Sequence, residues 1–130
     1  MKQIDGRTLG KWSLRLDAIY CAFLGAAVAI CAEPISAAVA LPFPLIAAVG
    51  VVVVLWAGIV LWMPTKLRLR TALRLVLGVN IVAALLVAVC ALAAATVPAA
   101  IAVLAVAASV ALFAASQTLA LRTLPTAANG

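Results

Sequence analysis

Apolar residues fill the chain in four long runs, which are separated by short stretches rich in proline or in charged residues. The runs cover residues 13–32, 45–62, 71–95 and 99–121. A helix of about 20 apolar residues is long enough to cross the hydrocarbon core of a bilayer. The β-branched run Val51–Val54 would favour a strand in water, but a lone strand in lipid leaves its backbone unpaired. The pattern therefore predicts an all-α membrane domain with four transmembrane helices over residues 13–122.

Three polar segments flank and divide the spans. Residues 1–12 form a polar arm, in which Gly6 and Gly10 argue against a strong helix. Residues 63–70 form a basic loop between the second and third spans, with a proline closing the second span. The tail, residues 123–130, is predicted to be flexible. One membrane domain with no soluble domain follows from this organisation.

Composition and charge fix the class of protein and its predicted orientation. The chain is 69% hydrophobic and 9% charged, with a mean hydropathy of +1.36, far from a typical soluble domain. All nine cations fall on one side of the predicted spans; they are Lys2, Arg7, Lys11, Arg15, Lys66, Arg68, Arg70, Arg74 and Arg122. Such a bias predicts a multi-pass protein of the bacterial inner (cytoplasmic) membrane with both termini in the cytoplasm.

The net charge of +6 would suggest nucleic acid in a soluble protein. Here the cations lie beside membrane spans, so anionic lipid is the predicted partner and nucleic acid is not. Lys66, Arg68 and Arg70 in the central loop are the predicted headgroup contacts.

The two halves of the chain show a repeated pattern. Arg15-Leu16 precedes an Ala-Ile-Cys-Ala sequence, and Arg74-Leu75 precedes Ala-Val-Cys-Ala at the same spacing. The offset predicts a duplicated helical hairpin with parallel repeats. Chance matching in a chain built from Ala, Val and Leu is the alternative.

Four polar residues at similar depth in the predicted spans form a candidate intramembrane cluster. They are Asp17, Arg74, Asn80 and Gln117. Ionisable residues inside a membrane are costly and often functional, so the cluster could bind an ion or a polar group. The alternative is a set of interhelical hydrogen bonds that hold the bundle together.

Glu33 is the alternative acid. It precedes Pro34, at the predicted start of a short interfacial helix, where its charge would favour the positive helix end. The Ala-Glu-Pro-Ile sequence around Glu33 also resembles the Ala-Glu-Val motif of small multidrug resistance transporters, which are four-helix proteins that exchange protons for cationic drugs. That resemblance implies a coupling role for Glu33, although Glu33 lies later in its span than the family's glutamate and few aromatic residues surround it.

Several kinds of chemistry have no support in the chain. There is no histidine, no CxxC pair and no Gly-rich phosphate loop, so no metal site and no cofactor are predicted. The three acids form no catalytic dyad, and we predict that the protein is not an enzyme. Cys21, Cys31 and Cys90 are predicted to pack as free thiols, with a bond between Cys31 and Cys90 as the alternative.

The start of the first span, Arg15-Leu16-Asp17, together with Leu41-Pro42 and Asn80, resembles a group of small four-helix integral membrane proteins of actinobacteria. The similarity covers most of the chain. It implies the same topology and a high-GC bacterial source, and it implies no activity.

Because the sequence offers so little chemistry, the leading prediction is a non-catalytic accessory or scaffold subunit of a larger membrane complex. A homo-oligomer is the alternative partner. Two other functions are considered: a small oligomeric transporter with Asp17 or Glu33 as the coupling acid, and a protein that binds anionic lipid.

Overall fold

The computed structural model describes residues 6–124, which form helices joined by short connections. Its elements are α1 (Gly6–Ile30), α2 (Ala32–Val39), α3 (Phe43–Lys66), α4 (Leu69–Cys90), a 3₁₀ turn (Ala91–Ala93) and α5 (Val97–Thr123). Helices α1, α3, α4 with its 3₁₀ turn, and α5 are each long and apolar enough to cross a membrane. The chain is therefore a multi-pass membrane protein of four spans, as the sequence predicts.

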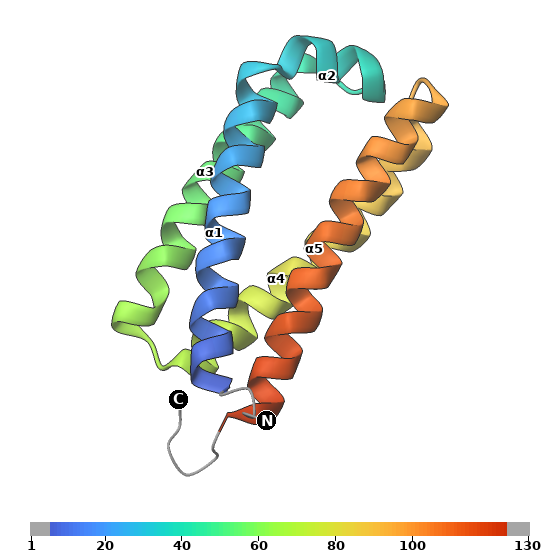
Figure 1. Ribbon diagram of the computed structural model, residues 1–130. Helices are drawn as coiled ribbons and strands as arrows, with labels where there is room; N and C mark the ends of the chain where they lie inside the picture. The colour runs from blue at the N-terminus through green and yellow to red at the C-terminus, as the bar shows by residue number, and fades with distance from the viewer. Residues whose placement is uncertain (1–5, 125–130) are drawn as a thin grey trace.

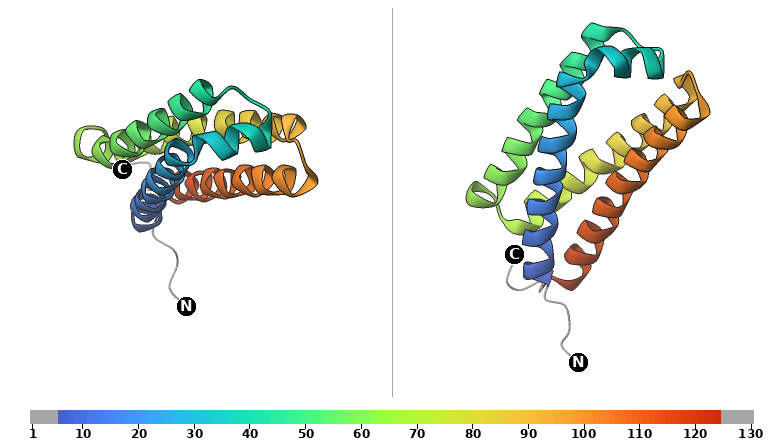
Figure 2. Two further views of the ribbon diagram at one scale, coloured as in Figure 1. Left: turned by 90° about the horizontal axis from the view of Figure 1, so that it is seen from above. Right: turned by 45° about the horizontal axis from the view of Figure 1, so that its top comes forward.

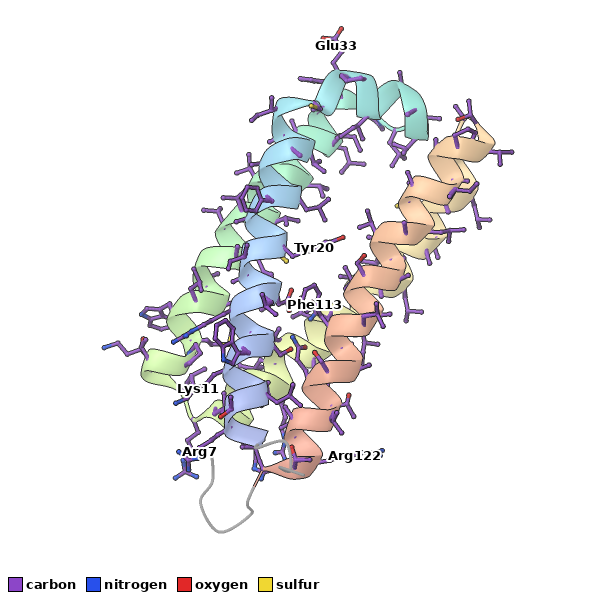
Figure 3. The ribbon with its side chains drawn as sticks, in the orientation of Figure 1. Arg7, Lys11, Tyr20, Glu33, Phe113 and Arg122 are labelled. Atoms are coloured by element: carbon purple, nitrogen blue, oxygen red, sulfur yellow. The ribbon has the colours of Figure 1, made fainter. Side chains whose placement is uncertain are left out.

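The four spans form two antiparallel hairpins. Helix α1 packs along α3, and α4 packs along α5 (Figure 1). The hairpins meet at the end that holds the start of α1, the α3–α4 connection and the end of α5, and they diverge toward α2 (Figure 2). We call the end where the hairpins meet the basic end, because Arg7, Lys11 and Arg122 lie there (Figure 3). The other is the α2 end.

The first hairpin depends on two glycines. A Cβ on Gly50 would lie 2.5 Å from the backbone nitrogen of Ala29, and a Cβ on Gly25 would lie 2.8 Å from the carbonyl oxygen of Gly50. Only hydrogen fits at either position, so the two backbones approach closely, as small residues permit in membrane helices.

The main apolar core lies at the basic end, where all four spans meet. Leu73, Val76 and Val60 are fully buried there. On α4 the buried positions follow helical spacing; they are Leu69, Ala72, Leu73, Val76 and Asn80. This stripe directs α4 toward α1 and α5.

At the α2 end, the short helix α2 bridges the two hairpins. The backbone N–H of Ala95 donates to the carbonyl of Ala38 at 2.8 Å, and Val103 of α5 packs against the buried cluster of Ala32, Val39 and Ile46. Ala40 ends α2 in the left-handed conformation, with φ of 55°. Helix α2 therefore ties the first hairpin to α5.

The helix boundaries differ from the predicted ones in two places. Helix α1 already begins at Gly6 and includes Gly10. A Cβ at Gly6 would clash with Thr123 and Leu124, and a Cβ at Gly10 would lie 2.9 Å from Leu73 Cδ1, so both glycines let α1 pack closely against its neighbours. Helix α3 continues through Pro64 to Lys66, and Leu67 and Arg68 alone connect it to α4. The predicted loop at 63–70 is therefore much shorter.

Residues 1–5 of the predicted arm and residues 125–130 of the predicted tail lie outside the described range. The duplication of the hairpin stays a prediction.

Candidate functional site

A hydrogen-bonded cluster around Asp17 joins the two hairpins inside the membrane domain. Asp17 Oδ2 accepts from Asn80 Nδ2 at 2.6 Å and from Gln117 Nε2 at 2.9 Å. Asn80 Nδ2 also donates to Gln117 Oε1 at 3.0 Å. The three side chains are 2%, 3% and 0% exposed, respectively. One carboxyl group and two amides from α1, α4 and α5 thus form a buried hydrogen-bonded network.

The second oxygen of Asp17 has a weaker partner. The Cys21 thiol, one turn further along α1, donates to Asp17 Oδ1 at 3.4 Å. Neither a lysine nor an arginine is among the partners of this carboxylate in residues 6–124. Asp17 is therefore a buried acid whose partners are all uncharged, which is a rare and costly arrangement in lipid.

Helical periodicity places these residues on facing stripes. Ser13, Asp17 and Cys21 are spaced four apart, so they lie on one face of α1, and that face also carries buried Gly10 and Ala18. Gln117 lies in the buried stripe of α5, between Ala114 and Ala120. The buried faces of α1 and α5 therefore carry apolar side chains along most of their length and polar side chains at the cluster.

Two further contacts tie α1 to α5 beside the cluster. The Ser13 and Ser116 hydroxyls lie 2.7 Å apart and share a hydrogen bond. The rings of Tyr20 and Phe113 pack with centroids 5.5 Å apart and a tilt of 55°; both side chains lie between α1 and α5 in Figure 3. These contacts hold the crossing of α1 and α5 in place.

Beside the cluster, on the side toward the α2 end, lies a central cleft of about 280 Å³. All four spans line it, with Tyr20, Cys21 and Leu24 from α1, Val52, Val53 and Trp56 from α3, Val79, Asn80, Ala83 and Val87 from α4, and Val106 and Val110 from α5. Apolar walls with a few polar groups are typical of sites for small molecules. Cys21 and Asn80 both line the cleft and both contact Asp17, so the carboxylate lies directly behind its wall.

Trp56 carries an unsatisfied donor in this wall. Its indole Nε1 is buried and has no hydrogen-bond partner in the described part of the chain. A buried N–H without an acceptor costs about 1–3 kcal/mol and needs an explanation. An acceptor on a bound molecule would provide one.

The structure brings Asp17, Asn80 and Gln117 together but leaves Arg74 out. Arg74 is exposed on α4. It precedes Asn80 by six residues, so the two side chains lie about 120° apart around the helix axis. The pairing of Arg74 with Asp17, predicted from depth alone, is wrong because depth ignores this rotation.

The other predicted residues lie away from the cluster. Glu33 is exposed in the first turn of α2 at the far end of the molecule (Figure 3). Lys66 and Arg68 are exposed at the basic end, as headgroup contacts require. Arg70 is half-buried, and its Nη2 donates to the carbonyl of Leu124 at 3.4 Å. All three cysteines are free thiols.

Sequence reasoning missed the contributions of Cys21, Ser13 and the Trp56 indole. The four-residue spacing of Ser13, Asp17 and Cys21 was a signal for Ser13 and Cys21, because it places both on the same helix face as Asp17. Trp56 had no such signal, since the spacing of residues along α3 does not show which acceptors lie near its indole N–H.

Comparison with protein-family models, with curated proteins and with solved structures gives no match.

Proposed function

We propose that this protein is a small membrane transporter whose central cleft binds a lipophilic monocation and whose Asp17 is the coupling acid. The observation that carries the proposal is a buried carboxylate that has no cationic partner among residues 6–124, placed behind the wall of a cleft that all four spans line. A charge in apolar surroundings is felt strongly over several ångströms, so an ionised Asp17 would attract a cation to the cleft.

The walls of the cleft support the same class of solute. Tyr20 and Trp56 offer aromatic groups, which attract cations. The remaining wall is mostly aliphatic and suits an apolar body. Because one chain supplies the whole cleft, binding needs no second copy, whereas the sequence suggested an oligomeric transporter.

The coupling role belongs to Asp17 and not to Glu33. A coupling acid must change its charge in response to the solute, and Asp17 contacts two residues of the cleft wall. Glu33 is exposed and lies on a different element, at the α2 end. Movement of Asn80 or Cys21 would give the solute direct access to the carboxylate.

The test is binding of radiolabelled tetrapropylammonium, a permanently charged apolar cation, to the purified protein in detergent. Asp17→Asn should abolish saturable binding, because the amide retains hydrogen-bonding capacity but removes the charge. Val53→Phe should also weaken binding by filling the cleft. Val51→Phe is the matched control, since Val51 is exposed on α3 and does not line the cleft. Unchanged binding in Asp17→Asn would contradict the proposal.

Transport is tested by counterflow of the same cation in proteoliposomes. The wild type should exchange external label for internal unlabelled cation, and Asp17→Asn should not. Binding without exchange would indicate that the protein binds the cation but does not transport it.

A role as an accessory subunit of a larger membrane complex is our second proposal for the function. The outer faces of the spans expose large apolar side chains, which suit lipid and a partner protein equally. Co-purification from the native membrane in mild detergent distinguishes the two functions, because an accessory subunit should bring a stoichiometric larger complex with it.

We also propose that the basic end faces the cytoplasm of a bacterial cell and that the protein lies in the inner membrane. The concentration of Lys and Arg at one end supports this orientation.

A further inference from the structure

A groove between α1 and α5 opens to the outside of the bundle and is separate from the central cleft. It measures about 440 Å³. Its lining consists of Leu9, Trp12, Ser13, Leu16 and Tyr20 from α1 and Ser109, Leu112, Phe113 and Ser116 from α5. The groove lies on spans that cross the membrane, so the acyl chains of lipid surround it.

We propose that this groove binds one acyl chain of an anionic phospholipid from the leaflet at the basic end. The proposal depends on neither Asp17 nor the central cleft.

The dimensions of the groove match such a chain. Tyr20 follows Leu9 by 11 residues along the α1 wall, which is a rise of about 17 Å. One leaflet contributes about half of a hydrocarbon core of about 30 Å. The groove therefore extends from headgroup level to the middle of the bilayer.

Defined contacts close the groove on its inner sides. The hydrogen bond between Ser13 and Ser116 joins the two helices that form its walls. The Tyr20–Phe113 pair does the same further along, toward the centre of the membrane. A chain that enters from the basic end would therefore meet a fixed wall and an aromatic stop.

A positive charge lies beside the outer half of the groove. The guanidinium of Arg15 lies 5.8 Å from the centre of the Trp12 ring, and Trp12 lines the groove. Both side chains are exposed. Trp and Arg at this level are suited to a phosphate-containing headgroup. The acid that follows on α1, Asp17, is buried on another face and does not neutralise Arg15.

The experiment uses quenching of Trp12 fluorescence by phospholipids with brominated acyl chains. Trp56→Phe and Trp62→Phe leave Trp12 as the single tryptophan of the full chain. The protein is reconstituted into vesicles that contain brominated phosphatidylglycerol or brominated phosphatidylcholine in increasing fractions. Quenching then gives the relative affinity of the groove for each lipid.

Phosphatidylglycerol should bind about fivefold more tightly than phosphatidylcholine, as one nearby arginine contributes. Arg15→Gln should remove that preference. Arg74→Gln is the matched control, because it removes an exposed arginine from the start of α4 and should leave the preference unchanged. Ser109→Phe should reduce quenching by both lipids, since it fills the groove.

Equal quenching by the two lipids in the wild type would overturn the anionic-lipid site. An absence of quenching by both lipids would also overturn it and would point to a second copy of the chain on this face. Retention of helical circular dichroism in each variant shows that the fold is intact.

Discussion

At the residue scale, the decisive feature is that the hydrogen-bond partners of Asp17 in residues 6–124 are all uncharged. Its carboxylate accepts hydrogen bonds from two amide groups and one thiol, each on a buried residue. Interhelical hydrogen bonds in membrane proteins contribute on average about 0.6 kcal/mol and at most about 1.7 kcal/mol each. The cluster therefore stabilises the union of the hairpins by a few kcal/mol at most, which is modest for an arrangement that buries an acid.

Replacing Asp17 tests that estimate. Asp17→Ala should lower the free energy of unfolding by about 1–3 kcal/mol, because Asn80 and Gln117 lose their shared acceptor. Asp17→Asn should cost less than about 1 kcal/mol. Unfolding by sodium dodecyl sulfate in mixed micelles, followed by circular dichroism, gives both values. Equal losses for the two variants would show that charge, and not hydrogen bonding, stabilises the cluster.

The unsatisfied indole N–H of Trp56 leads to a second prediction at this scale, which depends on the proposed function. Butyrylcholine, a quaternary ammonium with an ester acceptor, should bind about five- to tenfold more tightly than tetrapropylammonium, since one hydrogen bond to a buried donor contributes about that much. Trp56→Phe should remove the difference. Trp62→Phe is the control, because Trp62 is exposed on the same helix. A preference that survives Trp56→Phe would assign the acceptor to another group.

At the scale of the element, the spans and the depth of the polar residues could be predicted from the sequence. Four apolar runs gave four helices, and the common depth of Asp17, Asn80 and Gln117 correctly suggested that they could meet. Rotation around each helix could not be judged from depth, which is why Arg74 was misplaced. The start of α1 was missed because the helix propensity of glycine ignores its value in close packing.

The glycines of the first hairpin give a prediction at this scale. Gly50→Ala should separate α1 from α3 and lower the free energy of unfolding by about 1–3 kcal/mol, because its Cβ would meet the backbone of Ala29. Gly58→Ala is the control on the same helix. No atom lies within 4 Å of its added Cβ, so it should be neutral or slightly stabilising. Detergent-unfolding curves distinguish the two, and an equal effect would contradict the close packing.

At the scale of the whole molecule, the two hairpins meet at one end and are bridged by α2 at the other. The basic end contains the buried core and the polar cluster, whereas the α2 end is held by a short helix and one backbone hydrogen bond to Ala38. The cleft lies between these two attachments. If the protein is the transporter that we propose, these unequal attachments predict that the α2 end opens more easily than the basic end.

The orientation of the molecule can be tested with its own cysteines. Cys31 is exposed at the α2 end, so a membrane-impermeant maleimide added to intact cells should label it if the basic end is cytoplasmic. Cys21→Ala and Cys90→Ala leave Cys31 as the single thiol. Thr65→Cys in a background without other cysteines is the control, because Thr65 is exposed at the basic end and should react only after lysis. The reverse pattern would invert the topology.

The hydrogen bonds of Asp17 also have a consequence for the order of synthesis, because its partners lie in later spans. Gln117 follows Asp17 by 100 residues, and Asn80 follows it by 63. At a synthesis rate of about 5–20 residues per second, the first span waits about 5–20 s before its last partner has been made. During that interval Asp17 lies in or near the bilayer without Gln117, and for the first part of it without Asn80 as well. A truncated chain that lacks the last two spans therefore leaves this acid without the amide partners that it has in the folded bundle.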